Sequence, residues 1–353
     1  MNLNHLGWNQ FFEKNFKGYH EQGYFPGRIA VEHKHIYNVY TESGELQAEV
    51  SGKFHYQALK KADFPAVGDW VVLKTRPNEQ KAIIHELLPR KSKFSRKVAG
   101  LRSDEQIVAA NIETVFLLNS LNNDFNVRRI ERYLTLIWES GAKPVIVLNK
   151  ADLCNDLEDK LLEVEAIAFG IPVHVVSCKD GRGLEELNQY LKKGETIAFL
   201  GSSGVGKSTL INLILGNNKQ KTGAVRNDHK GKHTTTHREL ILVPGGALVI
   251  DTPGMREIQL RDSEQGSNKT FKDIESLASQ CKFNDCLHET EPGCAVKEAI
   301  EKGVITKERL KSYRKLQREI AYQEFRQKQK ADSIEKEKWR DISRYAKQLR
   351  KKL

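Results

Sequence analysis

The stretch that most restricts what this chain can fold into is residues 201–208. It reads Gly-Ser-Ser-Gly-Val-Gly-Lys-Ser and matches G-x-x-x-x-G-K-[ST] at every fixed position. A short apolar run, residues 195–200, precedes it, and an apolar segment with helical spacing, residues 209–215, follows it. A strand, a glycine-rich turn and a helix in this order form a phosphate-binding loop, whose backbone N–H groups point at the phosphates. The sequence therefore predicts a nucleoside triphosphate site on an α/β sheet.

Two side chains of this loop have predicted roles of their own. The Lys207 ammonium would reach the β- and γ-phosphates, and the Ser208 hydroxyl would be a ligand of Mg²⁺. The other residues predicted to line the phosphates are Gly201, Ser202, Ser203, Gly204, Val205, Gly206 and Thr209.

A second motif, Asn149-Lys150-Ala151-Asp152, predicts which base is bound. It ends the strongest predicted strand of the chain, residues 144–148. The Asp152 carboxylate can accept hydrogen bonds from the ring N–H and the exocyclic amine of guanine, whereas adenine offers neither donor at those positions. A polar mismatch of this kind discriminates by orders of magnitude. Guanine is the predicted base, with Asn149 and the Lys150 stem bracing the base and the phosphate loop.

Further polar groups follow other predicted strands. Ser177-Cys178-Lys179 ends the run 173–176 and resembles the S-A-K loop of GTPases, whose backbone binds the guanine carbonyl. Asp251 ends the run 247–250 at the position of a magnesium-associated aspartate, and Gly254 follows as a sensor of the γ-phosphate. The polar loop of residues 231–237 carries Thr235 and Thr236, either of which would complete the metal shell.

Three cysteines and one histidine near the C-terminus have metal-ligand spacing. Cys281, Cys286, His288 and Cys294 form the pattern C-x4-C-x-H-x5-C. Four such ligands make a closed tetrahedron, which is typical of structural zinc and leaves no position open for catalysis. Cys154 and Cys178 lie outside this cluster and are interpreted as packing residues.

The order of the motifs is unusual. Ordinary GTPases have the phosphate loop first and N-K-x-D and S-A-K last, whereas here residues 149–152 and 177–179 precede residues 201–208. The chain therefore resembles the circularly permuted GTPases, and more narrowly the small-ribosomal-subunit-dependent GTPases of the RsgA/YjeQ family. The resemblance spans residues 25–320. It implies a multidomain α/β protein with an N-terminal OB-type β-barrel, a permuted P-loop GTPase core and a C-terminal α-helical zinc domain.

The resemblance also implies a domain division and a function. The predicted parts are an N-terminal arm (1–24), an OB-fold RNA-binding domain (25–97), the GTPase domain (98–265), a zinc-binding domain (266–320) and a basic helical tail (321–353). The implied function is hydrolysis of GTP to GDP and phosphate, stimulated by the small ribosomal subunit, in late maturation of that subunit. Two alternatives stay open: a scaffold that binds ribosomal RNA under the control of GTP, and a metabolic kinase, for which no second substrate site is found.

The catalytic groups are the least specified part of the site. Many small GTPases place a glutamine just after D-x-x-G, but here the residue is Met255, which cannot accept a hydrogen bond from water. The resemblance implies that a histidine of the switch loop orients the water instead. His233 is the first candidate and His237 the second.

Charge and aromatic residues indicate a polyanionic partner. Residues 307–353 hold 17 Lys and Arg against 7 Asp and Glu, which is nearly the whole net charge of +11. The stretch 90–97 adds five basic residues around one Phe and is interpreted either as a phosphate-contacting segment or as a solvated linker. In the barrel, the candidates for stacking on RNA bases, or alternatively for filling the core, are Tyr37, Tyr40, Phe54 and Tyr56.

The resemblance implies the small ribosomal subunit and its RNA as partners, and the chain is expected to be a cytoplasmic monomer. Residues 1–24 lack the apolar segment of a signal peptide and are interpreted as a packing arm. No run of 18 apolar residues occurs, so no membrane span is predicted.

Overall fold

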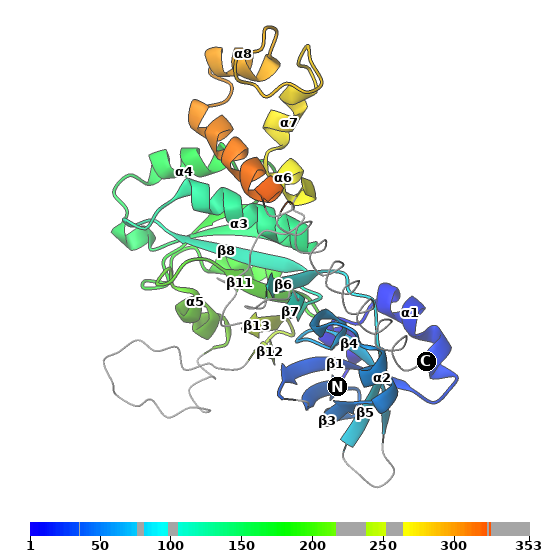
Figure 1. Cartoon of the computed structure of the whole chain (residues 1–353). Coiled ribbons are helices and arrows are strands. Elements are labelled where there is room, and N and C mark those ends of the chain that lie inside the picture. The colour runs from blue at the N-terminus through cyan, green and yellow to red at the C-terminus, as the bar shows by residue number, and fades with distance from the viewer. Residues whose placement is uncertain are drawn as a thin grey trace, which may run out of the picture. The chain divides into compact units, whose positions relative to one another are not determined.

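The computed structural model describes residues 1–34, 36–75, 81–97, 105–216, 238–251, 264–322 and 325. The chain divides into two compact units, Met1–Gln259 and Leu260–Leu353, and each is described here by itself (Figure 1).

The first part of the N-terminal unit is a five-stranded barrel. Its strands are β1 (Phe25–Glu32), β2 (Tyr37–Thr41), β3 (Gly44–Val50), β4 (Trp70–Thr75) and β5 (Lys81–Leu87), with the short helix α2 (Gly52–Gln57) between β3 and β4. The strand order is β1-β2-β3-β5-β4, and a pairing of β1 with β4 closes the barrel. Only β3 and β5 run parallel. This is an OB-like barrel, as expected.

Alternating residues of these strands fill the barrel. Ile29, Val39, Val71 and Ile84 are fully buried in one apolar cluster, because successive strand residues point to opposite faces. Tyr37 and Phe54 belong to the same cluster, and the hydroxyl of the half-buried Tyr40 lies 3.3 Å from the Leu240 carbonyl oxygen. Of the four aromatic residues considered for base stacking, Tyr56 alone is exposed.

The N-terminal arm packs against the barrel. It contains the 3-10 turn η1 (Leu3–Leu6) and the helix α1 (Gln10–His20), whose Phe12 and Phe16 are buried. The Trp8 ring meets the ring of Trp70 edge to face at 4.7 Å between centroids, a geometry that stabilises beyond burial alone. This segment therefore packs on the barrel through its aromatic side chains.

The second part of the unit is a mostly parallel sheet. Its strands are β8 (Thr114–Ser120), β9 (Lys143–Asn149), β10 (Val173–Val175), β11 (Thr196–Leu200), β12 (Glu239–Leu242) and β13 (Leu248–Asp251). Their order is β10-β9-β8-β11-β13-β12, and only β12 is antiparallel to its neighbour β13.

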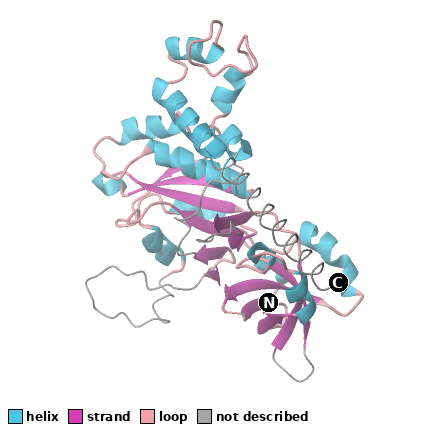
Figure 2. Ribbon diagram, in the orientation of Figure 1, coloured by secondary structure: helices cyan, strands magenta, loops and turns pink. Residues whose placement is uncertain are grey.

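Helices cover both sides of this sheet. The helices α3 (Val127–Ser140) and α4 (Leu157–Glu165) lie on one side and α5 (Lys207–Ile214) on the other (Figures 1 and 2). Two short 3-10 turns, η3 (Ala151–Leu153) and η4 (Glu185–Tyr190), complete the connections. Residues 176–195, all of which the structure describes, thus contain a 3-10 stretch and no α-helix.

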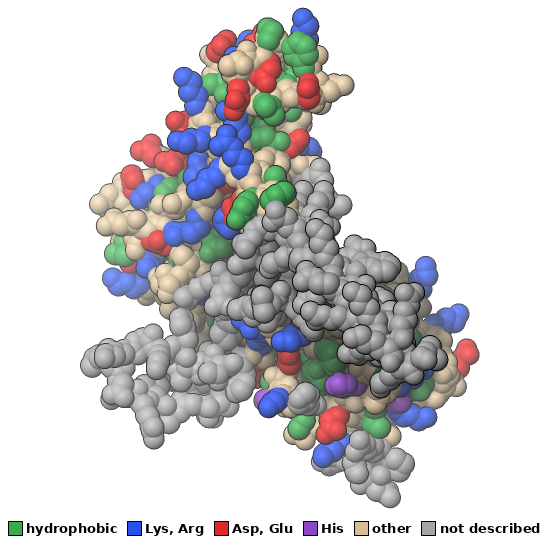
Figure 3. All heavy atoms as spheres, viewed as in Figure 1, with side chains coloured by type: hydrophobic (Ala, Val, Ile, Leu, Met, Phe, Trp, Pro, Cys, Tyr) green, Lys and Arg blue, Asp and Glu red, His purple; other side chains and the backbone are tan. Residues whose placement is uncertain are grey.

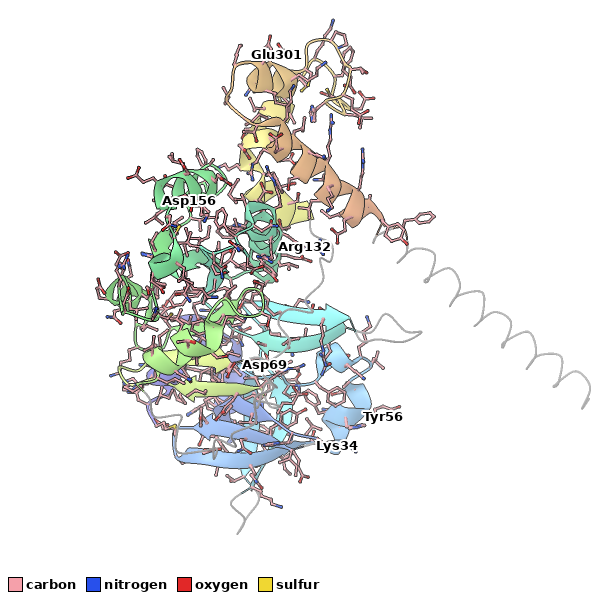
Figure 4. The ribbon with its side chains drawn as sticks, turned by 90° about the vertical axis from the view of Figure 1, so that its left-hand side faces the viewer. Lys34, Tyr56, Asp69, Arg132, Asp156 and Glu301 are labelled. Carbon is pink, nitrogen blue, oxygen red and sulfur yellow. The ribbon has the colours of Figure 1, made fainter. Side chains whose placement is uncertain are left out.

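The basic stretch 90–97 is more structured than a linker. Its second half is the strand β6 (Lys93–Lys97), which pairs with β7 (Glu105–Ala110), and Phe94 is buried. Two nitrogens of the Arg90 guanidinium bind the two carboxylate oxygens of the buried Asp69 at 2.7 and 2.8 Å (Figure 4). Arg90 and Phe94 therefore hold this junction together and do not face a nucleic acid.

The barrel and the nucleotide sheet are joined by one buried arginine. The Arg28 guanidinium, on β1, donates to the Gly68 and Leu6 carbonyls. It also donates to the Asn111 carbonyl and to the Thr196 hydroxyl, both at 2.9 Å. Thr196 begins the strand that leads into the phosphate loop, so one side chain connects arm, barrel and sheet. Strand β1 also pairs with β12, which makes the two sheets continuous.

The C-terminal unit is helical. Its elements are α6 (Glu264–Thr270), α7 (Lys272–Ala278), α8 (Ala295–Glu301) and a further helix over residues 307–322. The buried Arg309 binds both oxygens of Asp273 at 2.9 and 3.0 Å, and its guanidinium carbon lies 4.5 Å from the centre of the Phe271 ring. In neither unit does any described helix have the length and apolar character to cross a membrane.

Candidate nucleotide and metal sites

The predicted nucleotide motifs gather at one edge of the sheet. Strands β8, β9, β10, β11 and β13 are parallel, so their carboxyl ends share that edge. The segments 149–152, 177–179 and 201–206 each begin where one of these strands ends. Ligands of open α/β sheets bind in this position.

Close backbone contacts explain two glycines of the phosphate loop. Gly206 has a φ of 103°, and a Cβ placed on it would lie 2.2 Å from the Asn149 side-chain nitrogen. A Cβ on Gly201 would lie 2.3 Å from the Leu118 carbonyl oxygen. The loop passes so closely over the ends of β8 and β9 that only glycine fits at these two positions. The Lys207 ammonium, at the first turn of α5, donates to the carbonyls of Gly201 at 2.7 Å and Ser202 at 2.6 Å.

Asn149 connects the two loops predicted to bind the base with the predicted phosphate loop. Its side-chain nitrogen donates to the Val205 carbonyl at 2.8 Å, and its side-chain oxygen accepts from the Cys178 N–H at 3.1 Å. The side chain is buried. One side-chain amide thus connects the segments around residues 149, 178 and 205. Its nitrogen makes one of the two hydrogen bonds and its oxygen makes the other.

Asp152 and Ser177 are also brought together. The Ser177 hydroxyl donates to one Asp152 carboxylate oxygen at 3.0 Å, and the Lys179 ammonium lies 3.8 Å from the other. Lys150 has a left-handed backbone, with φ of 66°, which turns the chain sharply before Asp152. Burial raises the pKa of the Cys178 thiol, which suits the packing role expected for that side chain.

One residue of this site was missed by the sequence reasoning. The Ser202 hydroxyl donates to an Asp124 carboxylate oxygen at 2.7 Å, and Arg129 pairs with the same carboxylate at 2.9 Å. These two partners hold the pKa of Asp124 below its usual value, with the Ser202 hydrogen bond as the largest cause. No motif contains Asp124, and it lies 78 residues from Ser202, so no local signal reveals it.

The metal- and water-handling residues are described only in part. Asp251 is the last residue of β13, and it follows Ile250, which pairs with Ala198 of β11. Asp251 therefore lies at the same edge of the sheet as the phosphate loop. His233, His237, Thr235, Thr236 and Gly254 lie outside the described residues, and their roles stay predictions.

The cysteine–histidine cluster forms in the C-terminal unit. Ligand atoms of Cys281, Cys286, His288 and Cys294 all lie within 4.8 Å of one another. The Cys281 and Cys294 sulfurs are 3.9 Å apart, and each lies 3.5 or 3.6 Å from the His288 Nδ1. Since a tetrahedral zinc site with bonds of about 2.3 Å to sulfur has sulfurs about 3.8 Å apart, the donors present fit that metal.

Comparison with known proteins places the chain in a family. A family model described as RsgA GTPase matches residues 87–261. A "Small ribosomal subunit biogenesis GTPase RsgA 2" of Lactiplantibacillus plantarum is 54% identical over 86% of this chain and 85% of its own length. The chain belongs to the RsgA GTPase family. A second relative, "Small ribosomal subunit biogenesis GTPase RsgA 1" of Oceanobacillus iheyensis, is 46% identical over 99% of this chain and its whole length.

The solved structures agree with membership of the RsgA GTPase family. The structure described as "YloQ, a circularly permuted GTPase" is 28% identical, with a TM-score of 0.62, over 84% of this chain and 95% of that one. The permuted core and the OB-like barrel that the sequence predicts are thus confirmed. A model described as ABC transporter also matches residues 184–350. That range contains the phosphate loop, which the two classes share, but not residues 149–152.

As a member of the RsgA GTPase family, the chain is an enzyme that binds GTP and GDP and hydrolyses GTP. The loops 149–152, 177–179 and 201–206, predicted to bind guanine and phosphates, lie together at the edge of its sheet.

Proposed function

We propose that this GTPase acts in the late maturation of the small ribosomal subunit, with hydrolysis stimulated by that subunit. The curated relatives carry the name of small ribosomal subunit biogenesis factors, and identity over nearly the full chain supports transfer of that role. GTP would hold the form that binds the subunit, and hydrolysis to GDP would release it.

The observation that carries the nucleotide assignment is the double hydrogen bond of Asn149. Because this side chain fixes both the Val205 and the Cys178 backbone, the guanine loops are held at a set position against the phosphate loop. Asp152, restrained by Ser177, would accept the two guanine N–H groups. The Lys207 ammonium would exchange its two loop carbonyls for phosphate oxygens.

Magnesium is proposed to bind beside the phosphates. The Ser208 hydroxyl and the Asp251 carboxylate would hold it, with Thr235 or Thr236 completing the set, because oxygen donors are what Mg²⁺ prefers. When bound, Mg²⁺ offsets the charge that develops on the phosphates during transfer. His233, and after it His237, would orient the attacking water, since Met255 cannot.

The C-terminal unit is proposed to bind one structural zinc ion through Cys281, Cys286, His288 and Cys294. The ligand spacing supports this. Arg314, on the helix of residues 307–322, donates to the carbonyls of Leu287 and His288. The metal loop would therefore set the position of that helix.

Ribosomal RNA is proposed to meet two basic surfaces. On the barrel, α2 and the residues after it expose Tyr56 by 87% and Leu59 by 88%, among the lysines 53, 60 and 61 (Figure 4). An exposed aromatic ring among ammonium groups suits stacking on an unpaired base. In the C-terminal unit, Lys and Arg side chains gather over the helix of residues 307–322 (Figure 3). We further propose that the protein works as a cytoplasmic monomer.

A titration of purified small subunits into a GTP hydrolysis assay tests this function. We expect turnover to rise with subunit concentration and to saturate at stoichiometric binding. If subunits bind but turnover stays at its intrinsic value, the protein is a GTP-controlled scaffold instead. Purified large subunits, which should leave turnover unchanged, are the matched control.

A further inference from the structure

The surface of α4 and the turn after it, residues 153–169, is opposite in charge to the chain as a whole. It holds five carboxylates and one lysine, in a protein with a net charge of +11. We call residues 153–169 the α4 surface. Figure 3 shows Asp and Glu side chains over α4.

Large apolar side chains are exposed on the same surface. Leu153 is 56% exposed, Leu162 65% and Phe169 83%. The Ala166 N–H donates to the Leu162 carbonyl and the Ala168 N–H to the Val164 carbonyl, so helical geometry continues beyond Glu165. Leu162 lies in the last turn of α4, Ala166 directly follows its end, and Phe169 lies in the turn after it, and all three are exposed. An exposed apolar row of this kind, bordered by charged groups, is typical of an interaction surface.

Most of the carboxylates of the α4 surface have no partner within the described part of the chain. Asp156 pairs with Lys160 at 2.8 Å (Figure 4). By contrast, no ion pair or side-chain hydrogen bond among the described residues engages the exposed Glu158, Asp159, Glu163 or Glu165. Four solvated carboxylates beside an apolar row would repel RNA phosphates and attract Lys and Arg side chains.

The α4 surface is also connected to the nucleotide site. Along the chain, the predicted guanine motif and η3 lie between β9 and α4, and β10 lies between α4 and Ser177. The Lys160 ammonium donates to the Leu121 carbonyl at 3.0 Å. Leu121 begins the short segment that carries Asp124, which binds Ser202 of the phosphate loop. A partner that orders α4 would thus act on residues next to both the base and the phosphates.

We propose that the α4 surface docks a basic protein segment of the small ribosomal subunit that presents at least one apolar side chain. Lys or Arg groups of this segment pair with the four free carboxylates, and its apolar group covers Leu162 and Phe169. The proposal rests on the proposed function, because it assigns the partner to the same subunit. Under this proposal, the basic surfaces of the protein bind ribosomal RNA and the acidic α4 surface binds a ribosomal protein.

Two variants of the α4 surface test the proposal in the full-length protein. One replaces the apolar row, Leu162→Ser with Phe169→Ser, and the other reverses charge, Glu158→Lys with Glu163→Lys. The matched control changes one exposed apolar and one exposed acidic residue elsewhere, Val304→Ser with Glu301→Lys. Binding is measured to intact small subunits and, separately, to small-subunit rRNA freed of protein.

We expect each α4 variant to lose about tenfold in affinity for intact subunits, since one well-packed apolar or charged contact is worth that much. Affinity for the protein-free rRNA and intrinsic GTP hydrolysis should not fall. Benzoylphenylalanine in place of Phe169 should crosslink to a Lys- and Arg-rich segment of a subunit protein.

Three results would overturn the docking proposal: unchanged affinity for intact subunits, an equal loss toward protein-free rRNA, or a crosslink to rRNA or to a second copy of this chain. If the wild-type protein itself does not bind small subunits, the proposed function fails first and the docking proposal with it. Wild-type binding with unaffected variants defeats only the docking proposal.

Discussion

At the scale of single residues, the nucleotide site is built from side chains that hold the backbone of neighbouring loops. Asn149 bonds to Val205 and Cys178, and Ser202 bonds to Asp124. The motif residues were predictable because G-x-x-x-x-G-K-[ST] and N-K-x-D are local patterns with fixed spacing. Asp124 was not predictable, because its partner lies far along the chain and is reached only through the sheet.

Gly206→Ala should abolish GTP binding, while Gly204→Ala should weaken it much less. Both positions have a positive φ, so both variants are strained. Only the added Cβ at position 206 meets Asn149, at 2.2 Å, whereas nothing lies within 4 Å at position 204. Equilibrium binding of fluorescent GDP measures the difference. Equal losses in the two variants would contradict the tight packing of Asn149 on the loop.

Asp152→Asn should exchange base preference. The amide offers the wrong group to the guanine N–H donors but donates to the extra carbonyl of xanthine. We expect GTP affinity to fall by two or more orders of magnitude, on the order of 3 kcal/mol, and xanthosine triphosphate to bind instead. Competition binding measures the affinities for GTP and xanthosine triphosphate, with ATP as the reference nucleotide. Wild-type protein that binds ATP and GTP equally would refute guanine reading.

At the scale of elements, the sequence predicted the strands β9, β10, β11 and β13, because the apolar runs 144–148, 173–176, 195–200 and 247–250 end at turn residues. The sequence was less informative for segments whose structure depends on tertiary contacts. The stretch 90–97 was interpreted either as a phosphate-contacting segment or as a solvated linker, yet β6 forms there, Phe94 is buried and Arg90 binds Asp69. Likewise Tyr37 and Phe54 enter the barrel core. Tyr37 lies on β2, but Phe54 lies on the helix α2, so strand alternation could not have placed Phe54 in the core.

Cys286→Ala should remove zinc and loosen the C-terminal unit. Structural zinc sites gain much of their folding free energy from the metal, so three remaining ligands would bind it weakly. We expect a zinc content near one per chain in the wild type and much less in the variant, by metal analysis. Hydrogen exchange should increase in residues 264–322. Cys154→Ala, outside the cluster, is the control, and zinc-free wild-type protein would disprove the metal assignment.

At the scale of the whole molecule, the N-terminal unit works as one body because its two sheets share hydrogen bonds and one buried arginine. Arg28 and Thr196 are 168 residues apart in sequence, so no sequence pattern connects them. A resemblance to permuted GTPases predicts the barrel and the core separately. It does not predict the guanidinium that joins them.

Arg28→Lys should destabilise the N-terminal unit although it keeps the charge. A lysine cannot reach the four acceptors that the buried guanidinium serves. Unsatisfied buried polar groups cost about 1–3 kcal/mol each, so we expect a loss of about 3 kcal/mol or more in urea unfolding. Lys14→Ala, on the exposed side of α1, should change stability little. A wild-type midpoint in Arg28→Lys would show that the junction does not depend on this side chain.

Removing residues 326–353 should flatten the salt dependence of subunit binding. The deleted stretch contains 11 Lys and Arg against 4 Asp and Glu. Each phosphate that the protein no longer neutralises reduces the slope of log affinity against log salt, by about 0.7 for a single strand and about 0.9 for B-DNA. Intrinsic hydrolysis should survive, because no nucleotide motif lies in the deleted stretch. Binding across a salt series compares the two proteins, and identical slopes would mean that the tail binds no phosphates.

The closure of the barrel has a consequence for how the protein is made. All five barrel strands lie within residues 25–87, whereas the nucleotide sheet needs β13, at Leu248–Asp251, to reach β11. Chains emerge from their N-terminus and domains fold as units. We therefore expect the barrel to fold on the nascent chain well before the phosphate loop has the neighbour that flanks it. The Arg28 guanidinium would be in place in the folded barrel before its acceptor Thr196 is synthesised. The barrel, which is proposed to bind RNA, would therefore fold before the sheet that binds GTP.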